Sequence, residues 1–170
     1  CTSPWPIAVE MATVAATIAD GGRRPQPTFS PAAPPAHVAG TPVSSATVAH
    51  TVRRLMIAVV RSGTGTAAAI PGVTVAGKTG TAELKTASTC SPSSEKSSGE
   101  SSSKESSSES CGSAQSEASN TDAWFATFAP ALAPRIVVGV LLVQDGAGGA
   151  TAAPVARQVL EAGLQTHLGG

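Results

Sequence analysis

Apolar residues recur along the chain with helical spacing in two long segments. Between Ile7 and Asp20 they are frequent enough to form a broad buried face, and Gly21-Gly22 supplies residues that tolerate positive φ at a helix end. A second helix is expected after Ser44 or Ser45, either of which is a good N-cap, and Gly63 ends it. Its apolar positions recur at steps of three and four and predict one buried stripe: Val48, Val52, Leu55, Met56 and Val59.

Three shorter segments are rich in β-branched or apolar residues and predict strands. The first runs from Val73 to Gly77, after a Pro71-Gly72 turn, and continues into a Lys-Thr-Gly-Thr sequence at 78–81. The other two, Asp122 to Phe128 and Arg135 to Gln144, are separated by a short proline-containing loop and predict a hairpin. Together the three segments predict one antiparallel sheet.

The remaining segments connect or flank this sheet. Arg23 to Phe29 contains two prolines and predicts an edge or isolated strand, and Ser30 to Pro42 is rich in Pro and Ala and predicts a surface loop. A final helix is expected from Ala152 to Leu168, with one apolar side: Val155, Val159, Leu160 and Leu164. The order of helices and strands predicts a mixed α and β (α+β) fold, in which an antiparallel sheet is flanked by helices.

Serine makes up nearly half of the residues from Thr86 to Ser119, with Glu and Lys scattered among them. Such a segment buries too little apolar area to offset its ordering entropy, so we expect 86–119 to be a disordered insertion within the domain. About 135 residues remain, and a chain of that size buries about two thirds of its unfolded surface when it folds. Because the chain has three Phe, two Trp and no Tyr, its core must consist of Ala, Val, Leu and Ile.

The charge and hydropathy patterns exclude two classes of partner. Eleven Lys and Arg balance eleven Asp and Glu, and the basic residues form no stripe, so no binding to nucleic acid is expected. The longest apolar run, Ile136 to Val143, is much shorter than the roughly 20 residues that span a bilayer. No basic segment followed by an apolar stretch opens the chain. We therefore expect neither a membrane span nor an export signal in these 170 residues.

The cysteines predict no metal site, because none of the three has a Cys-x-x-Cys or His-linked spacing. Cys90 and Cys111 bracket the most serine-rich segment. If the protein is extracytoplasmic, a disulfide between them would close a loop of about 20 residues and contribute about 3 kcal/mol. Two unpaired thiols are the alternative.

Two glycine-rich segments are also weak candidates for ligand sites. The segment Gly63 to Thr66 lacks the Gly-Lys-Ser/Thr end of a phosphate-binding loop, and it predicts a flexible connection. The segment Asp145 to Gly149 has too few carboxylates for a cation site, and it predicts a loop between a strand and a helix. Neither segment is expected to carry the chemistry.

The candidate chemistry lies at the end of the first strand, in Lys78-Thr79-Gly80-Thr81. Glycine at position 80 removes a side chain, so the backbone of a peptide can lie against the strand and extend the sheet. Lys78 brings a positive charge to the same place. Four residues of this kind occur often by chance, so the surrounding sequence has to support the assignment.

The surrounding sequence resembles one protein family over essentially the whole chain outside the serine tract. The run from Ile70 to Glu83, the segment from Asp122 to Pro130 and the apolar strand after it look like the C-terminal half of bacterial penicillin-binding transpeptidases, and are most similar to class B, monofunctional penicillin-binding proteins. The helix that ends in Gly21-Gly22 and the closing helix from Ala153 to Leu164 resemble helices of the same family. The resemblance implies the fold shared by penicillin-binding transpeptidases and serine β-lactamases.

The resemblance also implies roles for the residues of the motif. Lys78 would support proton transfer around the nucleophile, and the hydroxyls of Thr79 and Thr81 would hold the substrate carboxylate. The backbone N–H of Thr81 would be one of two donors of the oxyanion hole, each typically worth about 3 kcal/mol. The candidate catalytic residues are therefore Lys78 and Thr81, and the candidate substrate-binding residues are Lys78, Thr79, Gly80, Thr81 and Ala82.

The nucleophilic serine of the family is expected outside these residues. The family's Ser-x-x-Lys and Ser-x-Asn motifs precede the Lys-Thr-Gly strand, so both should precede Cys1. The segments Ser93 to Lys96 and Ser101 to Lys104 match Ser-x-x-Lys, but they follow the strand in a tract where such matches arise by chance, and no Ser-x-Asn occurs. We therefore interpret 1–170 as the C-terminal portion of a transpeptidase domain, inactive by itself.

For the intact parent, the resemblance implies a membrane-anchored serine D,D-transpeptidase on the extracytoplasmic face of the bacterial cytoplasmic membrane. Its partners would be a peptidoglycan stem peptide ending in D-Ala-D-Ala, β-lactams and the missing N-terminal half of the domain, and no cofactor is implied. Two alternatives remain open. One is a fragment of a serine β-lactamase or of a β-lactam sensor, and the other is a non-catalytic module that binds a peptide at the sheet edge.

Overall fold

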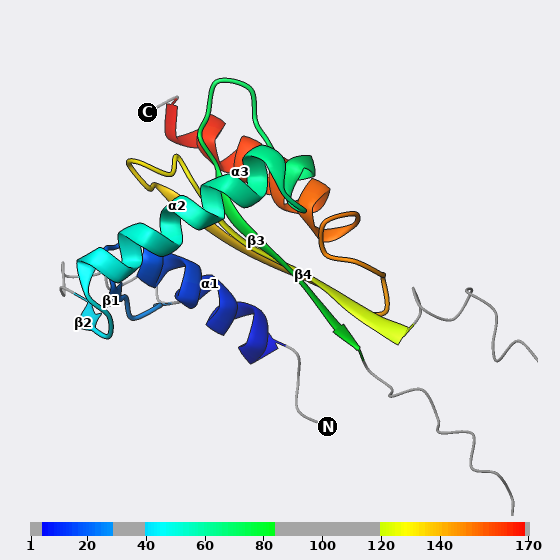
Figure 1. Ribbon diagram of the computed structural model, residues 1–170, viewed down its shortest axis with the longest axis horizontal. Coiled ribbons are helices and arrows are strands. Elements are labelled where there is room, and N and C mark those ends of the chain that lie inside the picture. The colour runs from blue at the N-terminus through cyan, green and yellow to red at the C-terminus, as the bar shows by residue number, and fades with distance from the viewer. Residues whose placement is uncertain (1–4, 29–39, 84–119, 169–170) are drawn as a thin grey trace, which may run out of the picture.

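The structure is a computed structural model that describes residues 5–28, 40–83 and 120–168. Figure 1 shows helices gathered around a small sheet. The elements in chain order are α1 (Trp5–Ala19), β1 (Arg23–Arg24), β2 (Thr41–Pro42), α2 (Ala46–Ser62), the 3-10 helix η1 (Thr66–Ala68), β3 (Ala76–Glu83), β4 (Thr121–Ala129), β5 (Ile136–Leu142) and α3 (Ala152–Leu168). None of the helices in these three described ranges is both long and apolar enough to pass through a bilayer.

A three-stranded antiparallel sheet in the order β3-β4-β5 forms the centre of the fold. β3 pairs with β4 along its whole length, from Ala76 opposite Phe128 to Glu83 opposite Thr121, and β5 lies on the other side of β4. The predicted antiparallel sheet flanked by helices is therefore confirmed. β3 is an edge strand of this sheet, and positions 84–119, which contain the predicted insertion and lie outside the described residues, join it to β4.

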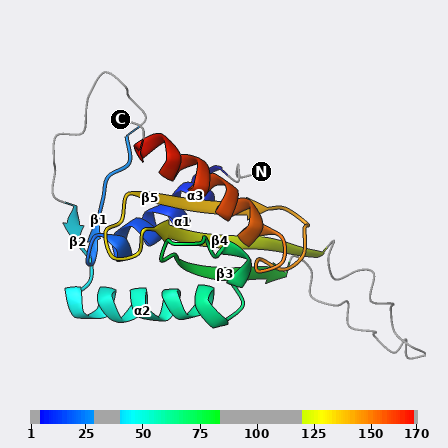
Figure 2. The same cartoon turned by 90° about the horizontal axis from the view of Figure 1, so that it is seen from above.

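Helices cover both faces of this sheet. Successive strand residues point to opposite faces, so each face has apolar side chains that a helix can bury. On one face Phe125 and Val140 pack against residues of α3, namely Ala152, Ala153, Ala156 and Leu160. On the other face Phe128 packs with Ala15 of α1 and Met56 of α2. Figure 2 shows α2 running alongside β3, with α3 on the opposite side of the strands.

Two glycines allow the helices to approach the sheet closely. A Cβ on Gly139 of β5 would lie 2.9 Å from the carbonyl oxygen of Ala8 and 3.1 Å from the amide nitrogen of Ala12, both in α1. A Cβ on Gly163 of α3 would collide with the side chain of Ile136 in β5. The expectation of a purely Ala, Val, Leu and Ile core is wrong, because Phe125 and Phe128 are fully buried. Since large side chains are otherwise few, the core also depends on backbone segments that lie this close together.

Two predicted helix ends are confirmed. Ser45 is the N-cap of α2, where its side chain accepts a hydrogen bond of 3.3 Å from the backbone N–H of Val48. Gly21 and Gly22 follow α1 with φ angles of 63° and 95°, which glycine adopts without steric strain. The start of α1 is two residues earlier than predicted, at Trp5, because a proline is tolerated in the first turn of a helix.

Two predicted extended segments are shorter than expected. The strand expected from Val73 begins at Ala76, because the Pro-Gly turn takes up the preceding residues and Val73 forms an isolated bridge with Ile70. Of the segment expected to be extended from Arg23 to Phe29, the described residues 23–28 form a strand only in β1, since Pro25 has no N–H to donate to a ladder. Its partner β2 lies at the end of the segment predicted as a loop.

The apolar stripes predicted for two helices are partly wrong. In α2, Val48 and Leu55 are 53% and 63% exposed. In α3, Val155 and Val159 are exposed, whereas the predicted Leu160 is buried and the predicted Leu164 packs against the core. The other residues of α3 that face the core are alanines that were not predicted: Ala152, Ala153 and Ala156. Spacing does not distinguish two adjacent stripes of equal period, and the small alanines are the ones that let α3 lie close to the sheet.

Candidate active-site strand

The motif predicted to carry the chemistry lies on β3, at the edge of the sheet. Figure 1 shows α2 crossing the start of this strand, whereas no helix crosses its arrowhead end in this view. Burial changes accordingly: Ala76 and Gly77 are buried, Lys78 is exposed, and the strand is fully exposed from Thr81 onward. The motif is therefore accessible to a ligand that approaches the sheet edge.

Lys78 lies on the face of the sheet that α1 and α2 cover. It pairs with Ala126 of β4, and both residues line a hollow between the two helices. The ammonium group of Lys78 donates a hydrogen bond to the backbone carbonyl of Thr79. The positive charge is thus held against the edge strand, beside an apolar hollow.

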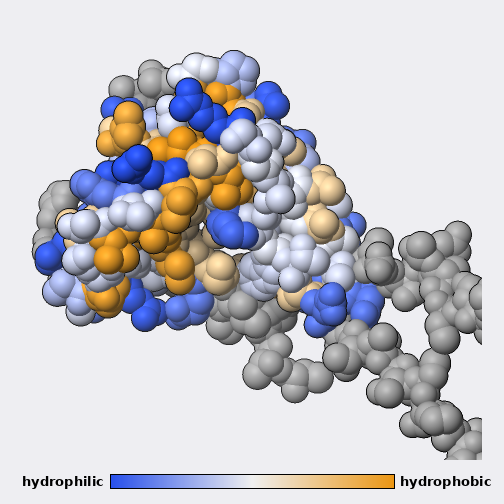
Figure 3. All heavy atoms as spheres, viewed as in Figure 1, coloured by the Kyte–Doolittle hydropathy of each residue, from blue (hydrophilic) through white to orange (hydrophobic). Residues whose placement is uncertain are grey.

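This hollow, which we call the α1–α2 groove, has a volume of about 340 Å³. Apart from Lys78 its lining is apolar, and it includes Val14, Ile18, Val52, Leu55, Met56 and Val59. Figure 3 shows hydrophobic atoms, coloured orange, gathered over α1 and α2 on this face. Val14 is 50% exposed, and Leu55 is even more so. A continuous apolar groove of this kind indicates an interaction surface.

Gly80 is packed on two sides. Its cross-strand neighbour is Trp124, and a Cβ on Gly80 would lie 3.1 Å from the Cβ of that tryptophan. From the side of α3, Gly148 approaches so closely that a Cβ there would collide with the carbonyl oxygens of Gly80 and Trp124. The missing side chain at position 80 therefore makes room for Trp124.

The substitution Gly148→Ala should push the loop before α3 away from β3. Its methyl group would meet two backbone carbonyl oxygens, which cannot move aside as a flexible side chain would, and we expect the free energy of unfolding to fall by about 2 kcal/mol. Denaturant unfolding of the 170-residue chain measures this. Ala150→Ser, at an exposed position of the same loop, is the control and should change the value by less than about 0.5 kcal/mol. An unchanged stability for Gly148→Ala would contradict this close approach.

Two loops, one after α2 and one before α3, approach the side chain of Thr79. Its hydroxyl oxygen lies 2.8 Å from the hydroxyl oxygen of Thr64, in the connection that follows α2, and either group can be the donor. Gly149, in the loop before α3, packs beside this pair: a Cβ there would lie 3.4 Å from Cγ2 of Thr79 and would collide with the carbonyl oxygen of Thr64. Thr79 is thus the point where β3 is tied to both loops.

The arrangement can bind the anionic end of an extended peptide. The hydroxyls of Thr79 and Thr81, two residues apart on β3, point to the same face of the sheet and can donate to a carboxylate, whereas Lys78 points to the opposite face, toward the α1–α2 groove. An edge strand binds an extended peptide by accepting it as an additional strand. In the part of the chain that the structure describes, no group of three or more His, Cys, Asp or Glu is placed to hold a metal ion.

A family model described as the penicillin binding protein transpeptidase domain matches residues 8–161. The chain belongs to this transpeptidase domain family. The match includes β3, the α1–α2 groove and the loops that contact Thr79 and Gly80, so the resemblance inferred from the motif is confirmed.

A curated relative of this transpeptidase domain is the peptidoglycan D,D-transpeptidase PbpA of Mycobacterium tuberculosis. It is 38% identical over 103 residues, which are 57% of this chain and 15% of PbpA. The chain therefore spans a small part of that relative.

Solved structures of transpeptidase domains have the same fold. The D,D-transpeptidase domain of a peptidoglycan glycosyltransferase from Eggerthella lenta matches with a TM-score of 0.63 and 33% identity, covering 94% of this chain and 32% of that chain. The M. tuberculosis PBPA structure matches with a TM-score of 0.61 and 29% identity, covering 92% and 32%. Its penicillin G acyl-enzyme complex matches with a TM-score of 0.58 and 29% identity, covering 90% and 31%. The predicted fold class is confirmed, and the chain spans about a third of each of these structures.

The transpeptidase fold brings the predicted site residues Lys78 to Ala82 together on one strand, where all but Thr79 and Gly80 are exposed. Their individual roles stay predictions. The predicted disulfide partners Cys90 and Cys111, and both Ser-x-x-Lys matches, lie at positions 84–119, outside the described residues.

Sequence reasoning missed three residues of the site, namely Thr64, Gly148 and Gly149. Their segments were expected to be only a flexible connection and a loop between a strand and a helix, whereas both contact the motif. The clustering of glycines was the available signal, because glycine is favoured where one backbone approaches another closely.

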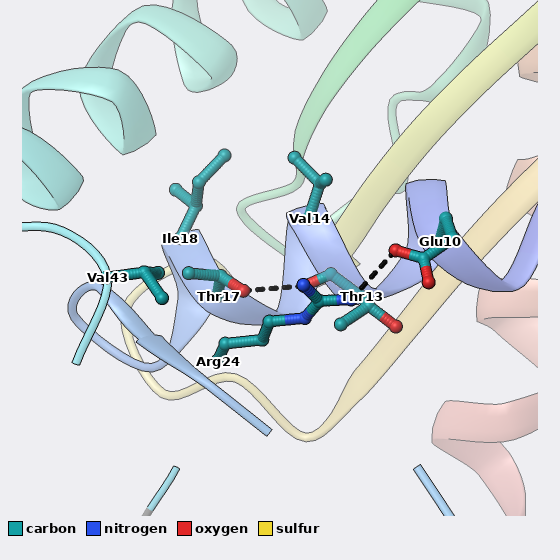
Figure 4. A pocket seen from close by; sticks show the side chains of 7 residues that line it. All are labelled: Glu10, Thr13, Val14, Thr17, Ile18, Arg24 and Val43. Atoms are coloured by element: carbon teal, nitrogen blue, oxygen red, sulfur yellow. Dashed lines mark hydrogen bonds and ion pairs between the residues drawn. The ribbon is translucent and has the colours of Figure 1, made fainter. Parts of the chain in front are cut away.

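A second hollow of about 300 Å³ lies between α1 and the β1–β2 pair of the transpeptidase domain. Figure 4 shows Arg24 reaching across it to Glu10, with which it forms an exposed ion pair of 2.9 Å. The hydroxyls of Thr13 and Thr17 donate to the carbonyl groups of Val9 and Thr13, within α1. Because these polar groups already have partners, we assign the functional site to the edge of β3.

Proposed function

We propose that this chain is the substrate-binding part of a serine D,D-transpeptidase that cross-links peptidoglycan. The observation that carries the proposal is the presence of Lys78, Thr79 and Thr81 on the edge strand β3, where Lys78 and Thr81 are exposed and Thr79 is half-buried, in a chain of the penicillin-binding transpeptidase family. The activity named for PbpA of M. tuberculosis supports it.

The substrate in this proposal is a stem peptide that ends in D-Ala-D-Ala. It lies along β3 as an additional strand, and its terminal carboxylate accepts hydrogen bonds from the hydroxyls of Thr79 and Thr81. The backbone N–H of Thr81 donates to the oxyanion that forms on the scissile carbonyl, Ala82 borders the bound peptide, and Lys78 supports proton transfer at the nucleophile. β-Lactams bind at the same edge, which the penicillin G acyl-enzyme of a relative supports.

The nucleophilic serine belongs to a part of the domain beyond these 170 residues. The chain covers 32% of the solved E. lenta transpeptidase domain, so most of such a domain lies elsewhere. In the reaction the serine oxygen attacks the carbonyl carbon of the D-Ala-D-Ala bond, an ester to serine forms and the terminal D-Ala leaves as an amine. An amine of a second stem peptide then takes the acyl group and frees the serine.

The rest of the domain packs into the α1–α2 groove. The groove is apolar and open on this chain, and it adjoins Lys78, so the part that fills it comes within reach of the cation. Burying side chains such as Leu55 there contributes stability in proportion to the apolar area removed from water.

Peptidoglycan is cross-linked outside the cytoplasmic membrane, so the protein acts on the extracytoplasmic face of that membrane, held by an anchor in its remaining part. The oxidising conditions outside the cytoplasm would permit a disulfide between Cys90 and Cys111. A loss of about 2 Da in intact mass relative to the reduced protein would reveal that bond, since two thiol hydrogens are removed when it forms.

Labelling with a fluorescent penicillin tests the proposal. The 170-residue chain alone should not be labelled, whereas a protein that joins it to the remaining transpeptidase domain should be labelled covalently at one serine. Gel fluorescence after denaturation measures this, and prior treatment with unlabelled penicillin G should block the signal. Covalent labelling of the isolated chain would place the nucleophile within these residues and contradict the assignment.

A further inference from the structure

The hydrogen bond between the hydroxyls of Thr64 and Thr79 can run in either direction. Each threonine hydroxyl has one proton to donate and can accept from others, and the 2.8 Å distance permits either residue to be the donor. A carboxylate only accepts. If Thr79 gave its proton to Thr64, it would have none left for a carboxylate at the edge of β3.

We infer that Thr64 is a positioning residue for carboxylate recognition, acting through Thr79. When a carboxylate binds, Thr64 donates its proton to the Thr79 oxygen and the Thr79 proton points to the carboxylate. Successive hydrogen bonds that run in one direction polarise and strengthen one another. This inference rests on the proposed function, because it needs a substrate whose carboxylate lies at β3.

The connection that carries Thr64 is held in place on both sides. The backbone N–H groups of Gly63 and Gly65 both bond to the carbonyl of Val59, at 3.1 and 3.0 Å. Gly65 is buried, and a Cβ there would lie 3.1 Å from the ring of Phe125. Thr64 thus projects from a rigid connection, so its hydroxyl is positioned before any ligand arrives.

The contact of Gly149 with both threonines limits where the hydroxyls can turn. A Cβ on this glycine would collide with the Thr64 carbonyl oxygen and touch the Thr79 methyl group. The Thr79 methyl therefore faces the loop before α3, which leaves its hydroxyl turned to Thr64. In the part of the chain that the structure describes, no other side-chain hydrogen bond is recorded for either hydroxyl.

The test uses a protein that carries the complete transpeptidase domain. Thr64→Val removes the hydroxyl and keeps the shape, and it should slow acylation by penicillin G about tenfold, since one directed hydrogen bond to an anion site is lost. Acylation by the penicillin G methyl ester, which has no carboxylate, should be slow in both proteins and change less than about twofold. Thr64→Ser should restore the penicillin G rate. Thr66→Val, at an exposed threonine two positions away, is the matched control and should have no effect.

The outcomes separate this inference from a structural role and from the proposed function. Equal slowing with the acid and the ester would mean that Thr64 only shapes the loop, and an unchanged rate with both would mean that it does not act; either result overturns the inference. In a Thr79→Ala background, Thr64→Val should have no further effect, and an additive loss would also contradict action through Thr79. An unmutated complete protein that penicillin does not label would overturn the proposed function itself.

Discussion

In a protein with the complete transpeptidase domain, Lys78→Ala should lower the rate of acylation by a fluorescent penicillin about a thousandfold. Lys78 is exposed on the edge strand beside the α1–α2 groove, and we propose that the nucleophile of the complete domain lies within its reach. General acid and base groups accelerate such steps about a hundredfold to ten-thousandfold. Stopped-flow or gel-based acylation kinetics measure the effect.

Two variants distinguish charge from proton transfer at position 78. Lys78→Arg keeps the charge, but guanidinium does not give up its proton in proteins, so acylation should remain slow while reversible binding of penicillin is largely kept. Arg54→Ala, which removes an exposed cation of α2, should leave the rate unchanged. If Lys78→Ala kept an acylation rate within about tenfold of the parent protein, the loss would be smaller than a proton-transfer residue causes, and that role for Lys78 would be wrong.

Leu55→Glu should destabilise the complete protein strongly and leave the stability of the short chain nearly unchanged. In the 170-residue chain Leu55 is 63% exposed, so the free energy of unfolding should change by less than about 0.5 kcal/mol. In the complete domain, where we propose that the groove is filled, a carboxylate there would be buried without a partner, and we expect a loss of about 4 kcal/mol. Denaturant unfolding of both proteins measures the difference.

A control on the same helix makes the comparison specific. Ala58 is exposed on the side of α2 that does not line the groove, so Ala58→Glu should be nearly neutral in both proteins. If Leu55→Glu were equally mild in both, the rest of the domain would not pack against this groove. Strong destabilisation of the short chain would instead mean that Leu55 is already covered there.

The strands around the motif were predictable because their signals are local. Glycine, proline and β-branched residues set where a chain turns or extends, so the hairpin of β4 and β5 and the turn before β3 were found. The start of β3 was placed three residues early, since the composition of Val73 to Val75 suits a strand as well as a turn-flanking bridge.

The faces of the helices were less predictable. In α3 the predicted Leu160 is buried, but the predicted Val155 and Val159 are exposed, and Ala153 and Ala156 face the core in their place. The structure buries the alanine stripe, because small side chains allow the helix to lie against a sheet that contains bulky Phe125. In α2 the exposed Leu55 borders a groove that no described part of this chain covers.

The sequence by itself determined the three α-helices, the three strands of the antiparallel sheet and a Lys-Thr-Gly-Thr motif whose surroundings identify the family, because each of these follows from neighbouring residues. Only the tertiary structure decided that Thr64 meets Thr79, that Gly148 approaches Gly80, and that Lys78 adjoins an open apolar groove. These contacts join segments far apart in the chain. Their geometry depends on how closely whole elements pack, and spacing along a sequence does not encode that distance.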